Sequence, residues 1–155
     1  MAEERKYPPF ETRNRIRTWC DLQERAHSHV VKKLYSWGVY RDEIDQIISE
    51  LISDNYLNEE RFARAFVSGK FRIKKWGWNK IETELKRKQV SKYSIAIAKK
   101  ELEEEDYLGT LKQLIEKKRP LVKAKSDWEL NQKLIRFAMS KGYTYEDIQS
   151  VMGDI

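Results

Sequence analysis

The stretch IETELKRKQVSKYSIAIAKKEL, residues Ile81 to Leu102, has an apolar pattern that recurs twice more in the chain. Its apolar positions are Ile81, Leu85, Val90, Ile95, Ala98 and Leu102. A shift of 51 positions toward the N-terminus superposes them on Val30, Leu34, Val39, Ile44, Ile47 and Leu51. A shift of 53 positions toward the C-terminus superposes them on Leu134, Ala138, Tyr143, Ile148, Val151 and Ile155. Because recurrence at such a period is typical of repeat architectures, the sequence predicts three copies of one unit.

Each copy is predicted to be helical throughout. Three prolines and six glycines interrupt a chain in which apolar residues follow the 3.6-residue period of an α-helix. Helices are expected near residues 13–22, 25–37, 41–53, 58–75, 78–88, 91–104, 106–123, 128–140 and 144–153. The predicted fold is therefore all-α, with three tandem three-helix repeats. Because such units bury apolar surface partly against their neighbours, we expect an elongated, curved array of short helices.

The repeats are expected at residues 13–57, 58–105 and 106–155, after a flexible N-terminal arm over residues 1–12. Gly38, Gly77 and Gly142 stand directly after residues 37, 76 and 141, and each is predicted to end a helix in a left-handed turn. Pro120 is expected to bend or end the helix that contains it.

Two asparagines are predicted at helix entries. Asn58 stands before the helix that contains Arg61, and Asn79 with Glu82 resembles a capping box.

Composition excludes several kinds of site. The single cysteine, Cys20, rules out an intramolecular disulfide, and His27 and His29 are too few for a metal site. The acidic run from Glu101 to Asp106 is interpreted as a solvated helix end, and no phosphate loop or nucleophile motif is present. No apolar run is long enough for a membrane span. We expect a cytoplasmic monomer that is not an enzyme and needs no cofactor.

Positive charge is concentrated in the middle of the chain. Residues 1–57 carry 9 basic and 10 acidic side chains, residues 58–100 carry 13 and 4, and residues 101–155 carry 9 and 11. Such a concentration favours an anionic partner.

The helix predicted at 58–75 has distinct faces. Rotation by about 100° per residue places Phe62, Phe66, Gly69, Ile73 and Trp76 on one stripe, which is predicted to pack inward. Trp76 and Trp78 are interpreted as core residues rather than base-stacking platforms. The basic residues that remain outward are the candidate partner-binding or nucleic-acid-binding residues: Arg61, Arg64, Lys70, Arg72, Lys74, Lys75, Lys80, Lys86, Arg87 and Lys88.

These cations have two interpretations. They are either the solvated side of amphipathic helices or a contact for a polyanion. The second is favoured because clustered like charges destabilise a helix unless something compensates them, and phosphate contacts would do so.

The chain resembles the RecX family of regulatory proteins. The resemblance rests on Tyr56-Leu57, Arg61-Phe62-Ala63, Gly77, Ile81 and Leu85, with Cys20, Glu24, Arg25, Ser28, Leu34 and Gly38 similar to the family's first repeat. It covers nearly the whole chain from about residue 13. In two places the chain departs from the family pattern. Asn58-Glu59 replaces a pair of aspartates, which weakens an acidic contact, and Gln89 replaces a glycine, which weakens a turn.

The resemblance implies a regulator that lies in the groove of the RecA–DNA filament, bridges neighbouring protomers and mainly inhibits the recombinase, ATPase and co-protease activities of RecA in DNA repair and the SOS response. The expected partners are the RecA filament and single- or double-stranded DNA, at least within it. Two alternatives remain at this point: a stand-alone, sequence-independent DNA-binding helical module, and a structural scaffold for another protein.

Overall fold

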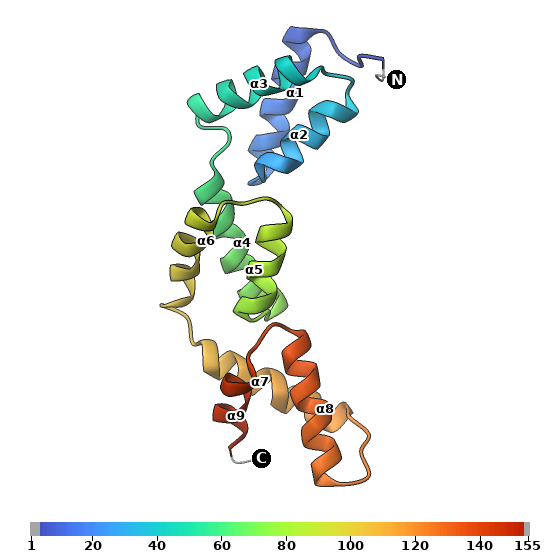
Figure 1. Ribbon diagram of the computed structural model, residues 1–155, viewed down its shortest axis with the longest axis vertical. Helices are drawn as coiled ribbons and strands as arrows, with labels where there is room; N and C mark the ends of the chain where they lie inside the picture. The colour runs from blue at the N-terminus through green and yellow to red at the C-terminus, as the bar shows by residue number, and fades with distance from the viewer. Residues whose placement is uncertain (1–3, 154–155) are drawn as a thin grey trace.

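The computed structural model describes residues 4–153, which form an elongated stack of three helical groups (Figure 1). The first repeat contains α1 (Pro9–Leu22), α2 (His27–Ser36) and α3 (Arg41–Ser53). The second contains α4 (Glu59–Lys74), α5 (Trp78–Arg87), α6 (Lys92–Lys99) and the short 3-10 helix η1 (Lys100–Leu102). The third contains α7 (Tyr107–Lys118), the 3-10 helix η2 (Arg119–Leu121), α8 (Asp127–Ser140) and α9 (Tyr145–Met152). The predicted all-α repeat fold is confirmed.

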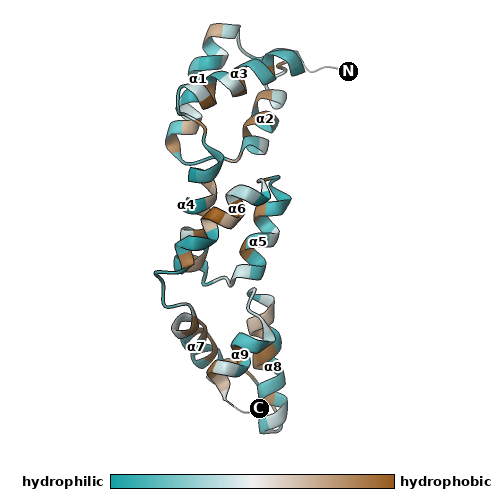
Figure 2. Cartoon of the chain, turned by 60° about the vertical axis from the view of Figure 1, so that its left-hand side comes forward, coloured by the Kyte–Doolittle hydropathy of each residue, from teal (hydrophilic) through white to brown (hydrophobic). Residues whose placement is uncertain are grey.

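The buried apolar side chains form three clusters that follow the three helical groups, except that Ala26, just before α2, belongs to the second cluster. Ile16, Leu34 and Ile44 are central to the first cluster, Ile81 to the second and Leu134 to the third, and each is fully buried. Apolar segments alternate with hydrophilic ones along the helices in every group (Figure 2). The repeat-defining pattern therefore marks core positions, although Ile155 lies outside the described residues. The exact repeat limits stay a prediction.

The N-terminal segment differs from the predicted flexible arm. Helix α1 begins at Pro9, earlier than expected, because a proline in the first helical turn needs no hydrogen-bond acceptor and its ring already has a helical φ. The Arg5 guanidinium binds the Glu43 carboxylate, and the Tyr7 ring packs edge-on against Trp37 at a centroid distance of 5.3 Å. The described part of the arm thus packs on the first repeat. Residues 1–3 of the predicted arm lie outside the described residues.

Three equivalent positions close the turn between the last two helices of each repeat. Gly38, Gln89 and Gly142 are related by the repeat shifts and have φ angles of 76°, 63° and 105°. The prediction of left-handed turns at Gly38 and Gly142 is confirmed. For Gly77 it is wrong, because Lys75 takes the left-handed conformation (φ 61°) and Gly77 has φ −79°.

Replacing Gln89 with glycine is expected to stabilise the protein. A side chain held in the left-handed region raises the free energy of the folded state by about 1–2 kcal/mol. Glycine removes this strain, but its greater conformational freedom in the unfolded chain offsets part of the gain in stability. We expect Gln89→Gly to raise the free energy of unfolding by about 0.5–1 kcal/mol, measured by urea titration. Lys88→Gly is the control, because Lys88 has φ −82° and gains nothing from glycine. A lower urea midpoint for Gln89→Gly would contradict the assignment of strain.

The second and third repeats meet through backbone atoms. The Gly77 N–H donates to the carbonyl of Lys141 at 2.7 Å, and the Asn79 N–H donates to the carbonyl of Gly142 at 3.0 Å. The Trp78 N–H donates to the Tyr107 hydroxyl at 2.8 Å. The first amides of α5 are therefore satisfied by the third repeat.

This contact overturns the predicted capping box at Asn79 and Glu82. Helix α5 begins at Trp78 with Gly77 as its N-cap, and no side chain among residues 4–153 caps it. The other predicted entry is confirmed, since the Asn58 side chain accepts a hydrogen bond from the Arg61 N–H at 2.8 Å. Pro120 lies in η2 directly after α7, so the prediction that this helix ends there is also confirmed.

Candidate functional site

The inward face of α4 is formed by Ala63, Val67 and Phe71, each at most 2% exposed. The predicted inward stripe of Phe62, Phe66, Gly69, Ile73 and Trp76 is wrong in its C-terminal half. Ile73 is 77% exposed, and Phe66 and Trp76 are only partly buried. The three inward residues, spaced by four along α4, belong to the buried cluster that also contains Ile95 and Ala98 of α6, the helix that packs most extensively on α4. The predicted stripe borders the core and continues onto the surface.

Arg61 is bound within the molecule. Its Nε lies 2.6 Å and 2.7 Å from the two carboxylate oxygens of Glu24, which precedes α2. Its guanidinium also donates to the Asn55 carbonyl at 3.1 Å and to the Tyr56 carbonyl at 3.4 Å. Arg61 therefore joins the first repeat to α4 and has little capacity left for a partner.

The other two arginines of α4 are also paired. Arg64 lies 2.8 Å from the Glu60 carboxylate and 3.8 Å from that of Glu101. Arg72 lies 2.6 Å from the Glu105 carboxylate. The acidic run after α6, interpreted from sequence as a solvated helix end, thus supplies carboxylates to α4. Sequence spacing did not predict these pairs because the partners are 33 and 37 residues apart.

The end of α5 carries two local ion pairs. Lys86 lies 3.5 Å from Glu82, and Arg87 lies 3.1 Å from Glu84. Both cations are well exposed, and such surface pairs contribute roughly 0–1 kcal/mol each. A polyanion can therefore compete for these two cations at little cost.

Three lysines stand over aromatic rings instead of carboxylates. The Lys70 ammonium lies 5.4 Å from the ring centroid of Phe66 and 5.0 Å from that of Trp76. Lys80 lies 4.6 Å from the Trp76 ring, and Lys88 lies 5.7 Å from the Phe66 ring. All three lysines are partly exposed, and cation–π attraction there holds an ammonium in place and leaves its N–H groups free to donate.

Two further lysines follow at the end of α4. Lys74 is exposed and lines a hollow on the outer side of the helix, beside Lys70. The Lys75 ammonium donates to the carbonyl of Arg72 at 2.6 Å. We call Lys70, Lys74, Lys80 and Lys88 the lysine face.

The structure therefore divides the ten candidate residues into two sets. Five have a carboxylate partner: Arg61, Arg64, Arg72, Lys86 and Arg87. The remaining five, the lysine face and Lys75, form no ion pair with any residue in the range 4–153. The sequence interpretation grouped all ten as one surface.

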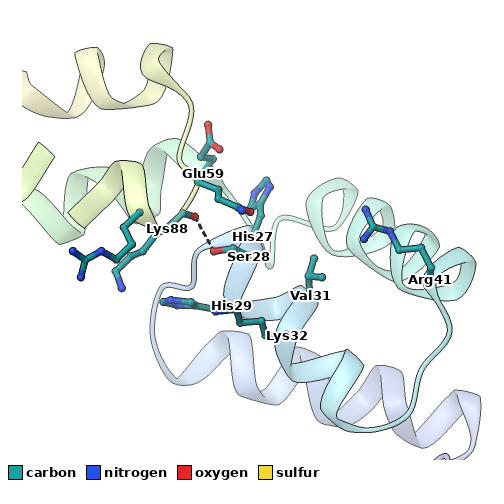
Figure 3. A pocket seen from close by; sticks show the side chains of 10 residues that line it. His27, Ser28, His29, Val31, Lys32, Arg41, Glu59 and Lys88 are labelled. Atoms are coloured by element: carbon teal, nitrogen blue, oxygen red, sulfur yellow. Dashed lines mark hydrogen bonds between the residues drawn. The ribbon is translucent and has the colours of Figure 1, made fainter. Parts of the chain in front are cut away.

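The junction of the first and second repeats contains an open cavity of about 480 Å³ (Figure 3). The Ser28 hydroxyl donates to the Lys88 carbonyl at 2.7 Å, and this bond crosses the junction. His27 and Glu59 lie close together at one end of the cavity, whereas Arg41 lies apart on α3. Side chains of both repeats line this cavity, among them Val31 of the first and Gln89 of the second.

Glu59 ties α4 to α6 and was not predicted as a functional residue. Its carboxylate accepts hydrogen bonds from the Ser91 and Ser94 hydroxyls at 2.5 Å and 2.7 Å. Burial by itself would raise the pKa of Glu59, but the hydrogen bonds from both serines outweigh it and hold the pKa below its usual value. Burial also lowers the pKa of His27. Glu59 therefore stays ionised and holds the start of α6.

Chemically reactive groups are sparse in this region. Burial raises the pKa of the Cys20 thiol to about 11, so this side chain stays protonated at neutral pH.

Within residues 4–153, no three His, Cys, Asp or Glu side chains are placed to hold a metal ion. No helix in that range has the length and apolar character needed to cross a membrane.

Comparison with known proteins gives family matches to the second and third repeats. A family model described as the second three-helix domain of RecX matches residues 58–98, and one described as the third three-helix domain matches residues 104–152. These segments together make up more than half of the chain. The crystal structure of RecX from Lactobacillus salivarius has a TM-score of 0.82 at 21% identity and covers 93% of this chain and 94% of its own. A second crystal structure, of a regulatory protein RecX, has a TM-score of 0.84 at 18% identity, and the match covers 93% of this chain and 71% of that protein's chain.

Sequence relatives agree with this assignment. The regulatory protein RecX of Clostridium perfringens strain SM101 is 36% identical over 77% of this chain, and the match spans 57% of that relative's length. The regulatory protein RecX of Clostridium tetani is 27% identical over the whole chain and 71% of its own length. With two of the three helical repeats matched by its domain models, the chain belongs to the RecX family of regulatory proteins.

Proposed function

We propose that this protein is a cytoplasmic, monomeric regulator of the RecA recombinase that binds the RecA–DNA filament and mainly inhibits its recombinase, ATPase and co-protease activities. Family membership supports this role. The observation that carries it is the lysine face, a set of cations without carboxylate partners among the described residues, on the middle repeat of an elongated array. Such a surface can enter a groove and meet negative charge there.

The division of the basic residues refines the proposed contact. Arg61, Arg64 and Arg72 already have carboxylate partners, so a filament would have to replace these before it gained a new contact. Unpaired ammonium groups cost less to engage because only water and loosely held counterions are displaced. We therefore assign the lysine face, and not Arg61, Arg64 and Arg72, to the filament contact.

Charge reversal tests this assignment. The triple variant Lys70→Glu, Lys74→Glu, Lys80→Glu is expected to bind RecA filaments, assembled on single-stranded DNA with an ATP analogue, at least tenfold more weakly, a loss of about 1.4 kcal/mol. Its affinity should also depend less steeply on salt, because fewer ions are released on binding. Filament binding is measured by fluorescence anisotropy across a salt series, together with inhibition of RecA ATPase.

The matched control is Lys112→Glu, Lys117→Glu, Lys123→Glu in the third repeat, where all three lysines are exposed. It changes the net charge equally, so equal weakening by both variants would remove the lysine face from the mechanism. Helical circular dichroism checks the fold of both variants. Tight binding of the unmodified protein to naked DNA, with no preference for filaments, would favour a stand-alone DNA-binding module instead.

A further inference from the structure

The outer side of α4 carries a continuous groove. Two hollows of about 390 Å³ and 190 Å³ adjoin there and share Ala65, Phe66 and Lys70 in their linings. The floor is apolar: Phe66 is partly buried and Ile73 is 77% exposed. The space beside Gly69 is open, because a Cβ added at this residue would meet no atom within 4 Å. From Phe62 to Ile73 the groove is about 17 Å long, enough for roughly five residues of extended chain.

Positive charge surrounds this apolar floor. Lys70 and Lys74 line the hollows from α4, and Lys88 reaches the first hollow from the end of α5. Among the described residues, Glu24 is the only one that brings a carboxylate to either lining, and Arg61 holds that carboxylate at 2.6 Å. The groove therefore combines exposed aliphatic surface with ammonium groups that have no ion-pair partner in residues 4–153.

The ring contacts favour a protein segment over a nucleic acid. Base stacking needs a free aromatic face, but Lys70 and Lys88 stand over the Phe66 ring, and Lys70 and Lys80 stand over the Trp76 ring. Carboxylates would instead meet the ammonium groups where they already lie. Ile73 offers aliphatic surface, which an apolar side chain covers better than a base does.

We propose that the α4 groove is a docking site for an acidic peptide segment of a partner protein, which places an apolar side chain on Phe66 and Ile73 and its carboxylates against Lys70, Lys74 and Lys88. The docking proposal goes beyond the proposed function. It concerns the chemistry of the bound peptide and does not depend on which partner protein carries that peptide. Charge complementarity with a desolvated apolar contact at the centre is the usual arrangement of a specific peptide site.

A labelled synthetic peptide, in which aspartates and glutamates flank a leucine pair, provides the probe. Fluorescence anisotropy should detect saturable binding to the full-length protein. Ile73→Glu and Lys70→Glu should each weaken binding about tenfold, and a peptide with serines in place of the leucines should bind about tenfold more weakly as well. Both positions tolerate a change of side chain, because Ile73 is exposed and Lys70 has no ion-pair partner among the described residues.

Leu121→Glu and Lys112→Glu are the matched controls. Leu121 is an apolar side chain in the third repeat that is 74% exposed, and Lys112 is an exposed lysine there. Unchanged peptide binding in both controls supports the α4 groove. The proposal is overturned if the peptide does not bind, if the controls weaken binding equally, or if leucine and serine peptides bind alike. It is also overturned if oligo(dT) binds with the same dependence on Ile73, which would make the groove a nucleic-acid site.

Discussion

Substituting Gly77 with alanine is expected to uncouple the third repeat from the second. The added Cβ would lie 2.6 Å from the carbonyl carbon and oxygen of Gly142 and 2.8 Å from Cγ of Tyr143. Two of these are backbone atoms, so the clash is relieved only if the two repeats move apart. Alanine adopts the φ of −79° at this position without strain, so the effect comes from the contact alone.

Separation would break the hydrogen bonds that cross the junction. These include Gly77 N–H to the Lys141 carbonyl at 2.7 Å and the Tyr143 hydroxyl to the Lys75 carbonyl at 2.8 Å. With about 1 kcal/mol for each of these two bonds and 1–3 kcal/mol for overpacking, we expect a loss of at least about 3–5 kcal/mol. Because repeat proteins draw stability from neighbour interfaces, the third repeat should then unfold in a separate step.

Urea titration followed by circular dichroism, with amide hydrogen exchange of α7 to α9, measures this uncoupling. Gly69→Ala is the control: its Cβ meets nothing within 4 Å, and alanine within a helix is more stable than glycine by about 0.5–1 kcal/mol. The two glycine substitutions should therefore change stability in opposite directions. A single, unshifted transition for Gly77→Ala would show that the backbone contact does not couple the repeats.

Truncating Phe71 is expected to lose far more stability than truncating Ile73, although both are large apolar residues of α4. Phe71 is 2% exposed, and its ring packs edge-on against Tyr107 of the third repeat at a centroid distance of 5.7 Å. Phe71→Ala should lower the free energy of unfolding by about 3–5 kcal/mol, because it removes buried surface and leaves a cavity. Ile73→Ala removes a side chain that is 77% exposed, so its effect should stay within about 0.5 kcal/mol.

Thermal and urea denaturation of the two variants measures the difference. Val67→Ala provides an internal check, since Val67 is fully buried on the same ridge as Phe71 and should also destabilise the protein. If Ile73→Ala proved as damaging as Phe71→Ala, the stripe predicted from sequence would be the inward one and the exposed groove would not exist.

Much of the fold was predictable because helices and repeats leave local signals. Most predicted helix ends lie within two residues of the observed ones, since caps such as Asn58 and turns such as Gly38 act over a few positions. The repeat shifts also predicted that Ile81 and Leu134 are buried. The largest difference among the helix starts is at Pro9. It arose because two consecutive prolines, here Pro8 and Pro9, can stand at the start of a helix as well as at the end of a loop.

The candidate site was less predictable because its properties depend on distant partners. The net charge of the middle segment indicated an anionic partner, but not which cations were available. Glu24, Glu101 and Glu105 neutralise arginines that lie 33 to 37 residues away, and no local pattern joins them. The contacts between lysines and aromatic rings could not be predicted either, because they depend on where the rings lie in the folded protein.

The sequence by itself determined that the chain is all-helical and built of three copies of one unit, with excess positive charge on the middle copy. Periodicity, turn residues and net charge are local or additive, and they do not change when helices are brought together. The tertiary structure decided which apolar stripe of α4 faces inward. Residues 62, 66, 69 and 73 and residues 63, 67 and 71 form two apolar stripes on the same helix, and packing against α5 and α6 buries the second stripe more completely than the first. The tertiary structure also decided that α5 begins on the carbonyl groups of the third repeat, because a helix end left without a local cap takes whatever acceptor its neighbour supplies.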